Sequence, residues 1–289
     1  MTDANHFARS WQPAASPFVP GRAGLRPRLR VRQSCCLATL VAATLLLSAC
    51  GQSSYTWGWY VVWPTTEQGQ RNLRFLVSGL WNTIAISGTA IAFSMAAGLV
   101  VGMCGIARHK VARGFNRLYV EFVRAIPILV LVLWIYYGLP VLFESAGLNI
   151  NFDVFTAGVV ALALSDSAFQ AEIFRAGIQS IDRGQHEASD SLGLNYLDKM
   201  RYVILPQAIR RILPPLGNQF VYMLKMSSLV SVIGMTELTR RANELVVAEY
   251  RPLEIYSVLV LEYLALILVV SWLVRRLERR LGANQLAGR

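Results

Sequence analysis

Long apolar runs alternate along this chain with segments rich in charge. Five of these runs come near the roughly 20 residues that a helix needs to cross a bilayer. They cover residues 78–106, 125–143, 154–172, 215–235 and 255–274. The pattern therefore predicts an all-α integral membrane protein with one membrane domain over residues 78–285, built on five core spans.

The N-terminal part follows a different pattern. Residues 1–34 are rich in Pro, Ser, Gly and Arg, a mixture too poor in apolar surface to offset the entropy of ordering, and we expect a disordered basic tail. A shorter apolar run, 35–50, ends in Leu-Ser-Ala-Cys at Cys50, like the end of a bacterial lipoprotein signal. Two interpretations stay open: a cleaved signal that leaves Cys50 acylated, or an uncleaved first span.

Residues 51–77 lie on the external face under both interpretations. Their Trp and Tyr side chains suit the interface between membrane and water. The aromatic residues are Trp57, Trp59, Tyr60 and Trp63.

Lys and Arg indicate the orientation, because loops rich in them stay preferentially in the cytoplasm. They fill the loop 107–124, the segment 173–214 and the C-terminal tail, whereas the loop 144–153 has none. We therefore expect a multi-pass protein of the cytoplasmic (inner) membrane, in contact with membrane lipid, with a cytoplasmic C-terminus. Arg240, Arg241 and Arg251 depart from the rule, because they fall in a loop expected to be external.

Composition agrees with a membrane protein. Hydrophobic residues make up 54% of the chain and charged residues 16%, against roughly 25% charged in an average soluble domain. The net charge of +11 does not indicate a nucleic-acid partner, because the basic residues lie beside apolar runs and form no stripe with exposed aromatics. Neither a metal-ligand spacing nor a G-x-S-x-G elbow nor a phosphate-binding loop is present. We expect no catalytic residue, no metal site and no cofactor in this chain.

Polar residues inside spans are costly and usually face a cavity or a partner. We take six of them as candidates for a substrate path. For Lys225 the alternative is an ion pair that fixes helix packing, and for Glu172 it is a place at the cytoplasmic interface beside Arg175. Glu262 interrupts the last span without an identifiable partner. The six candidates are Asp166, Glu172, Gln219, Lys225, Ser227 and Ser228.

The segment 183–206 is too long for a plain connection and predicts a pair of short helices. One helix is expected over 185–192, and a second runs from Tyr196 to about Leu205 with Asn195 as its N-cap. Gly193 suits the left-handed turn between them. Pro206 is expected to end or kink the second helix, because it disfavours helical geometry at Leu205. A bent pair of helices that stands off the membrane is suited to docking.

This segment resembles the cytoplasmic loop of the inner-membrane subunits of ABC importers. Their pattern is Glu-Ala-Ala, three residues, Gly, nine residues, Ile, one residue and Leu-Pro. Further stretches, "YVEFVRAIPILVLVLWIYYGLP", "AEIFRAGIQSI" and "RYVILPQAIRRILPPLGNQF", are similar to permeases for polar amino acids, and the resemblance covers about 55–285. The matching loop positions are Glu187, Ala188, Ser189, Gly193, Val203, Leu205 and Pro206, with conservative departures at Ser189 and Val203.

The resemblance implies the type I transmembrane domain of an ABC importer for a polar L-amino acid. Such permeases pair with a second permease, either the same chain or a sister chain. They dock through the loop on two cytosolic ATPases that bind ATP and Mg, and they receive substrate from a periplasmic or lipid-anchored amino-acid-binding protein. Many relatives have Lys-Asp-Thr-Ser-Leu where this chain has Lys225-Met226-Ser227-Ser228-Leu229, and the missing carboxylate favours a neutral or acidic substrate. The alternatives are an ion-coupled secondary transporter and a lipid-anchored membrane scaffold.

Overall fold

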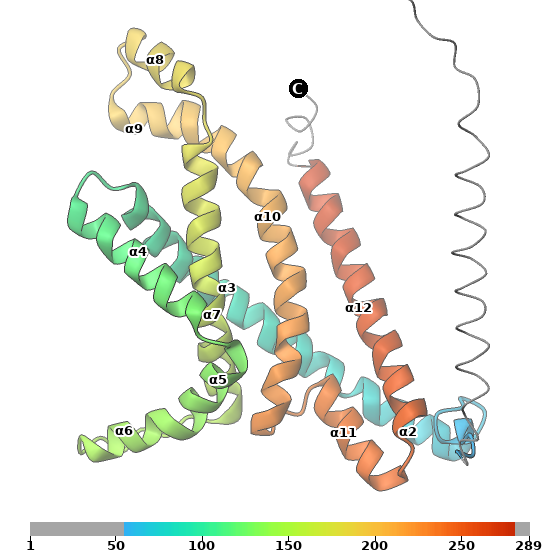
Figure 1. Cartoon of the computed structure of the whole chain (residues 1–289). Coiled ribbons are helices and arrows are strands. Elements are labelled where there is room, and N and C mark those ends of the chain that lie inside the picture. Colours follow the sequence, from blue (N-terminus) through green and yellow to red (C-terminus); the bar gives the residue numbers. More distant parts are fainter. Residues whose placement is uncertain (1–54, 281–289) are drawn as a thin grey trace, which may run out of the picture. The chain divides into compact units, whose positions relative to one another are not determined.

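The computed structural model describes residues 55–280, and within them all regular structure is helical (Figure 1). This confirms the all-α fold. The expected basic tail, the apolar segment 35–50 with Cys50, and the end of the C-terminal tail lie outside the described residues. The α-helices are α2 (Glu67–Val77), α3 (Gly79–Ile106), α4 (Lys110–Ala125), α5 (Ile128–Leu133), α6 (Leu139–Ser145), α7 (Val154–Gln179), α8 (Arg183–Ser191), α9 (Tyr196–Asp198), α10 (Leu205–Met226), α11 (Leu238–Glu249) and α12 (Pro252–Arg280).

Tighter and wider helical turns join several of these helices. They are the 3-10 segments η1 (Trp59–Val61) and η4 (Ser227–Ile233), and the π-helical segments η2 (Trp134–Gly138) and η3 (Lys199–Ile204).

Five stretches are long and apolar enough to cross a membrane, provided that Tyr196–Ile233 and α11, which meet at a bend of 48°, count as one span. Each overlaps one of the five runs expected from the sequence. The other four are Glu67–Ile106, Ile128–Ser145, α7 and α12.

Helices also occupy two segments where the sequence pattern indicated none. α2 lies in the aromatic segment 51–77 and begins where Thr66 Oγ1 accepts a hydrogen bond from the Gly69 N–H at 3.0 Å. α4 fills the basic loop after the first span and ends just before Pro127, beyond which α5 begins. Both helices alternate apolar and charged positions, so they lack the long apolar runs by which spans are recognised.

α3 and α7 pack against each other along most of their length (Figure 1). A Cβ at Gly98 would lie 2.4 Å from the Cβ of Gln170, and one at Gly102 would lie 2.8 Å from the Ala171 carbonyl oxygen. The small-xxx-small spacing of these glycines thus serves close helix packing.

Pro206 does not end its helix, but it lies where the chain changes direction between η3 and α10 (Figure 1). Of the two outcomes expected from the sequence, an end or a kink, the structure has the kink. Leu205 has helical angles (φ −59°, ψ −43°), and helical structure continues from Tyr196 to Ile233. The π-helical turn η3 precedes the proline, and the Leu205 N–H bonds to the Met200 carbonyl five residues back. Prolines and π-helical turns are both common causes of helix kinks.

α11 occupies the segment that was expected to be an external loop. It carries Arg240 and Arg241, two of the three arginines that depart from the charge rule. Arg240 Nε lies 3.0 Å and Arg241 Nη1 3.2 Å from the two carboxylate oxygens of Glu244. The positive charge of this segment is therefore partly balanced by a carboxylate on the same helix.

Candidate functional site

α8 and α9 project at the end of α7, away from α5, α6 and α11 (Figure 1). Asp182 is the N-cap of α8, and its Oδ1 accepts a hydrogen bond from the Gly184 N–H at 2.7 Å. At its other end the Gly193 N–H bonds to the Asp190 carbonyl at 3.0 Å and the Leu194 N–H to the Ser189 carbonyl at 3.1 Å. This double closure is a Schellman motif, and Gly193 has the positive φ that it needs, +71°. The expected left-handed turn is present.

The second limb begins at Asn195, as expected, where the side-chain Oδ1 accepts the Asp198 N–H at 2.9 Å. Lys199 Nζ lies 2.5 Å from Asp190 Oδ1 and so connects the two limbs. Gln207 Nε2 donates to Gln185 Oε1 at 3.0 Å, which ties the start of α10 to α8.

The loop is fixed to both membrane helices that flank it. Ile181, Ile204, Ala208 and Ile212 form a buried apolar cluster with side chains from the end of α7. Arg211 donates a hydrogen bond to the carbonyl of Ser180. The bent pair of helices is therefore a packed extension of α7 and α10.

The motif residues divide into an inner and an outer set. Ser189 is buried and its hydroxyl bonds to the Gln185 carbonyl at 2.6 Å, while Val203 is half-buried. Glu187, Ala188, Leu205 and Pro206 are exposed.

Two observations bear on the roles of Glu187 and Gly193. The Glu187 carboxylate makes no hydrogen bond or ion pair with any described side chain or backbone group. A Cβ on Gly193 would meet nothing within 4 Å, so the left-handed conformation, and not a close approach, requires the glycine. The outer surface also carries two large apolar side chains, because Leu192 and Leu197 are 78% and 75% exposed.

A network of hydrogen bonds joins three spans at Asp166. The side chain is 3% exposed, and its Oδ2 accepts from Ser94 Oγ of α3 at 2.6 Å and from Gln170 Nε2 of α7 at 3.0 Å. Gln219 Nε2 of α10 donates to Oδ1. Two candidates from the sequence, Asp166 and Gln219, are thus brought together, and the Gln170 Oε1 is left buried without a partner.

Glu172 lies apart from this network. It forms a two-bond ion pair with Arg175 on the same helix, with distances of 3.1 Å from Nε and 2.7 Å from Nη2. Glu172 therefore lies beside Arg175, as in its alternative interpretation, while its place at the cytoplasmic interface stays a prediction.

Lys225 and its neighbours are also separate from Asp166. Lys225 is exposed and has no ion pair among the described residues, so the packing pair considered for it is absent. It lines a cavity of about 350 Å³ between α10 and α12, together with Glu278. The Ser227 and Ser228 hydroxyls both bond to backbone carbonyls one turn back, at 2.9 and 2.7 Å.

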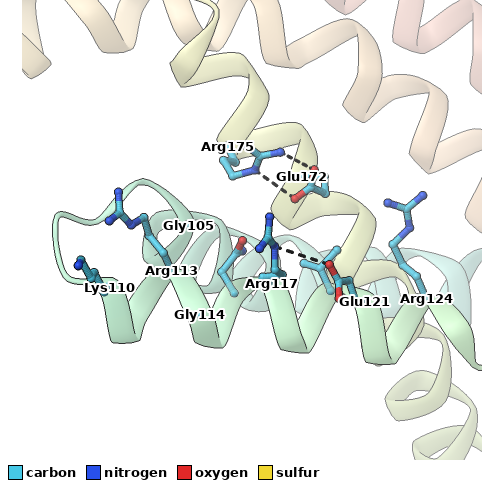
Figure 2. Close-up of a pocket in the computed structure, with 11 residues that line it drawn as sticks. Gly105, Lys110, Arg113, Gly114, Arg117, Glu121, Arg124, Glu172 and Arg175 are labelled. Carbon is cyan, nitrogen blue, oxygen red and sulfur yellow. Dashed lines mark hydrogen bonds and ion pairs between the residues drawn. The ribbon is translucent and has the colours of Figure 1, made fainter.

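A larger cavity, of about 620 Å³, lies between α4 and the ends of α3 and α7. Figure 2 shows basic side chains of α4 rising toward the Glu172–Arg175 pair of α7. The cavity is lined by five cationic residues, Lys110, Arg113, Arg117, Arg124 and Arg175, and by two acidic ones, Glu121 and Glu172.

Sequence reasoning did not select Ser94 or Gln170, which complete the network around Asp166. Both lie on positions of α3 and α7 that face each other, beside the glycines that let the helices approach. The available signal for Gln170 was a polar side chain one helical turn after Asp166. Glu262 keeps both carboxylate oxygens buried without a hydrogen-bond partner.

Comparison with known proteins gives a consistent match. A family model described as "binding-protein-dependent transport system inner membrane component" matches residues 76–283. The glutamine transport system permease protein GlnP of Escherichia coli (strain K12) is 39% identical over 223 residues, which cover 77% of this chain and 97% of GlnP. The arginine transport system permease protein ArtQ of Bacillus subtilis (strain 168) is 34% identical over 210 residues, which cover 73% of this chain and 94% of ArtQ.

Solved structures agree. A chain from the crystal structure of an amino acid ABC transporter with histidines is 41% identical, with a TM-score of 0.67, over 73% of this chain and 96% of that one. A chain of the inward facing MetNI methionine ABC transporter shares the fold at 23% identity, with a TM-score of 0.60, over 73% of this chain and 98% of that one.

Proposed function

The chain belongs to the binding-protein-dependent transport system inner membrane components and is a permease subunit of the amino-acid ABC importer type; from this premise we propose how it transports and what drives it. Its substrate is a polar L-amino acid that crosses the cytoplasmic membrane. Energy comes from two separate cytosolic ATPases, which bind ATP and Mg.

The proposed coupling to the ATPases rests on one observation, the two different sides of the α8–α9 loop. Its outer surface presents Ala188, Leu192 and Leu197 to solvent, while its inner surface is packed on α7 and α10. A partner that binds the outer surface can therefore act on both α7 and α10, as in a two-state element biased by a ligand. An exposed Glu187 at the start of this surface is free to pair with a cation of the ATPase.

The same two helices meet at the network around Asp166, which we propose as part of the substrate path. α7 contributes Asp166 and Gln170, and α10 contributes Gln219. Movement of α7 against α10 breaks the bond between Gln219 and Asp166 and exposes amide and carboxylate groups. These groups suit the ammonium and the polar side chain of an amino acid.

The remaining candidates belong to a second part of the path. Lys225, Ser227 and Ser228 lie near the bend between α10 and α11, and the Lys225 ammonium has no ion pair among the described residues. We propose that the lysine attracts the substrate carboxylate. A neutral substrate such as glutamine fits a site with one buried carboxylate and one cation, and relatives named for glutamine transport support this choice.

We propose that the C-terminus of α12 and the α8–α9 loop face the cytoplasm, and that residues 55–66 and α11 face the external side. A second permease subunit, identical or a sister chain, completes the path. An external amino-acid-binding protein delivers the substrate.

Copurification with the ATPase tests the coupling. Glu187→Arg is expected to abolish retention of the ATPase in detergent and ATP-dependent glutamine uptake into proteoliposomes, because it reverses the charge at the docking surface. Membrane insertion should remain normal, since the exposed side chain has no hydrogen bond or ion pair among the described residues. Glu144→Arg, an exposed acidic position of α6, is the matched control. Full uptake by the Glu187 variant contradicts the proposal, as does uptake by the permease alone with only an ion gradient.

A further inference from the structure

α4 presents three different faces along its length. One face is buried against the other helices through Asn116, Val120 and Val123. A second face is apolar and exposed, at the spacing i, i+4, i+7 and i+11 that forms one stripe on a helix. The exposed stripe consists of Val111, Phe115, Leu118 and Phe122, which are 54–85% exposed.

The third face is basic and lines the 620 Å³ cavity described above. Figure 2 shows Lys110, Arg113, Arg117 and Arg124 projecting from one side of α4. The cavity has three more cationic than acidic side chains in its lining. It therefore has a positive charge that the described residues do not balance.

The cations differ in what they already bind. Arg117 lies 3.7 Å from Glu121, and Arg175 is held by Glu172. Arg124 lies over the ring of Phe169, 4.8 Å from its centroid. Lys110 and Arg113 have no ion pair among the described residues, and both are exposed. These two side chains are therefore available to an anion.

We propose that the cavity on α4 binds the phosphate of an anionic phospholipid, and that the neighbouring apolar stripe lies against the acyl chains. A phosphate diester matches a pocket of Arg and Lys side chains, and basic pockets between membrane helices are known to hold such headgroups. The apolar stripe beside the pocket favours a lipid over a free phosphate ion, because a free ion would leave the stripe without a role.

The position of α4 is consistent with this occupant. The helix connects two spans, and it has the basic face and the apolar face of a helix that lies in the membrane interface. Glu172 and Arg175 border the cavity near the end of α7 that leads into α8. The lipid would thus come from the leaflet on the side of the α8–α9 loop, which is the cytoplasmic leaflet if the proposed function holds.

Binding is tested on the full transporter complex, stripped of lipid in a non-ionic detergent. Labelled dioleoyl phosphatidylglycerol is titrated against labelled dioleoyl phosphatidylcholine, and inorganic phosphate is added as a competitor. The complex should bind phosphatidylglycerol more tightly, and millimolar phosphate should displace it only weakly.

Variants assign the binding to α4. The double variant Lys110→Gln, Arg113→Gln should weaken phosphatidylglycerol binding about thirtyfold, since each cation near an anionic surface contributes roughly fivefold. Arg279→Gln, Arg280→Gln removes the same charge from exposed positions of α12 and should change binding less than about twofold, since the effect falls off within a Debye length. Leu118→Gln, Phe122→Gln should weaken lipid binding by removing the apolar contact.

Three results would overturn the proposal. The first is equal affinity of the wild-type complex for the two lipids. The second is unchanged binding in the Lys110, Arg113 variant. The third is full displacement by inorganic phosphate together with no effect of the Leu118, Phe122 variant, which would identify a site for free phosphate. Binding is measured without substrate or ATP, so its failure is distinct from a failure of the proposed transport function.

Discussion

Single glycines set two features of this molecule for different physical reasons. Gly98 is needed because a Cβ there would overlap Gln170 on the neighbouring helix, and Gly193 is needed because its φ is +71° in otherwise open space. The first is a matter of volume and the second of backbone conformation. Substitutions at the two positions should therefore affect different properties.

Gly98→Val should destabilise the folded protein, because a helix pair already in contact must move apart. Overpacking of this kind typically costs about 1–3 kcal/mol. The measurement is the melting temperature of the purified complex in detergent. Gly88→Ala, on the same helix with nothing within 4 Å of the added Cβ, should leave the melting temperature unchanged or raise it slightly. Equal melting temperatures for Gly98→Val and the wild type would show that α3 and α7 are not closely packed in the membrane.

Asp166 is a buried carboxylate that accepts three side-chain hydrogen bonds. Asp166→Asn removes the charge and turns one acceptor into a donor, and bonds to a charged group contribute about 1.5–3 kcal/mol. If that free energy is lost from the transport step, glutamine uptake should fall by roughly 10- to 100-fold. The ATPase should still copurify. Glu144→Gln, at an exposed position of α6 outside the proposed path and the docking loop, serves as the control and should change uptake little. Normal uptake by Asp166→Asn would remove the carboxylate from the path.

At the scale of elements, the α8–α9 loop combines a packed inner side with an unpacked outer side. Ile204 and Ala208 are fully buried against α7, whereas Leu197, on the same limb, is 75% exposed. Under the proposed function, Leu197 is one of the apolar side chains that contact the ATPase, and it contributes little to the folding of this chain.

Leu197→Asp should change the free energy of unfolding of the permease by no more than about 0.5 kcal/mol, as for an ordinary surface substitution. Binding of the ATPase should weaken by at least 2 kcal/mol if the leucine is a central contact. Retention of the ATPase on the affinity-tagged permease measures this. The control variant Arg279→Asp, at an exposed position of α12, should still retain the ATPase. Undiminished retention in Leu197→Asp would place the interface elsewhere.

For the whole molecule, the proposed orientation in the membrane can be tested at the two ends of α7. Asn149 precedes the helix in a segment without Lys or Arg, and Ser191 ends α8, which follows α7 at its other end. Arg240 and Arg241 on α11, both paired with Glu244, remain an exception to the rule that Lys and Arg favour the cytoplasmic side.

A membrane-impermeant maleimide tests this orientation in intact spheroplasts. With Cys35, Cys36, Cys50 and Cys104 replaced by Ser, Asn149→Cys should be labelled from outside, and Ser191→Cys should be labelled only after the membrane is permeabilised. The reverse pattern would overturn the proposed topology and, with it, the placement of the ATPase.

The sequence by itself determined the number and approximate limits of the spans, the bent helix pair and its Gly193 turn, and the family. These depend on local signals: the length of an apolar run, a helix cap, and a motif of fixed spacing. The tertiary structure alone decided that α4 and α2 are helices with partly buried faces, that Pro206 is carried within a helix after a π turn, and that Ser94, Gln170 and Gln219 surround Asp166. The hydrogen-bond network at Asp166 joins residues far apart in the chain, so no single segment carries a signal for it. α2 and α4 do have an amphipathic pattern, but it is weaker than the long apolar runs by which spans are recognised.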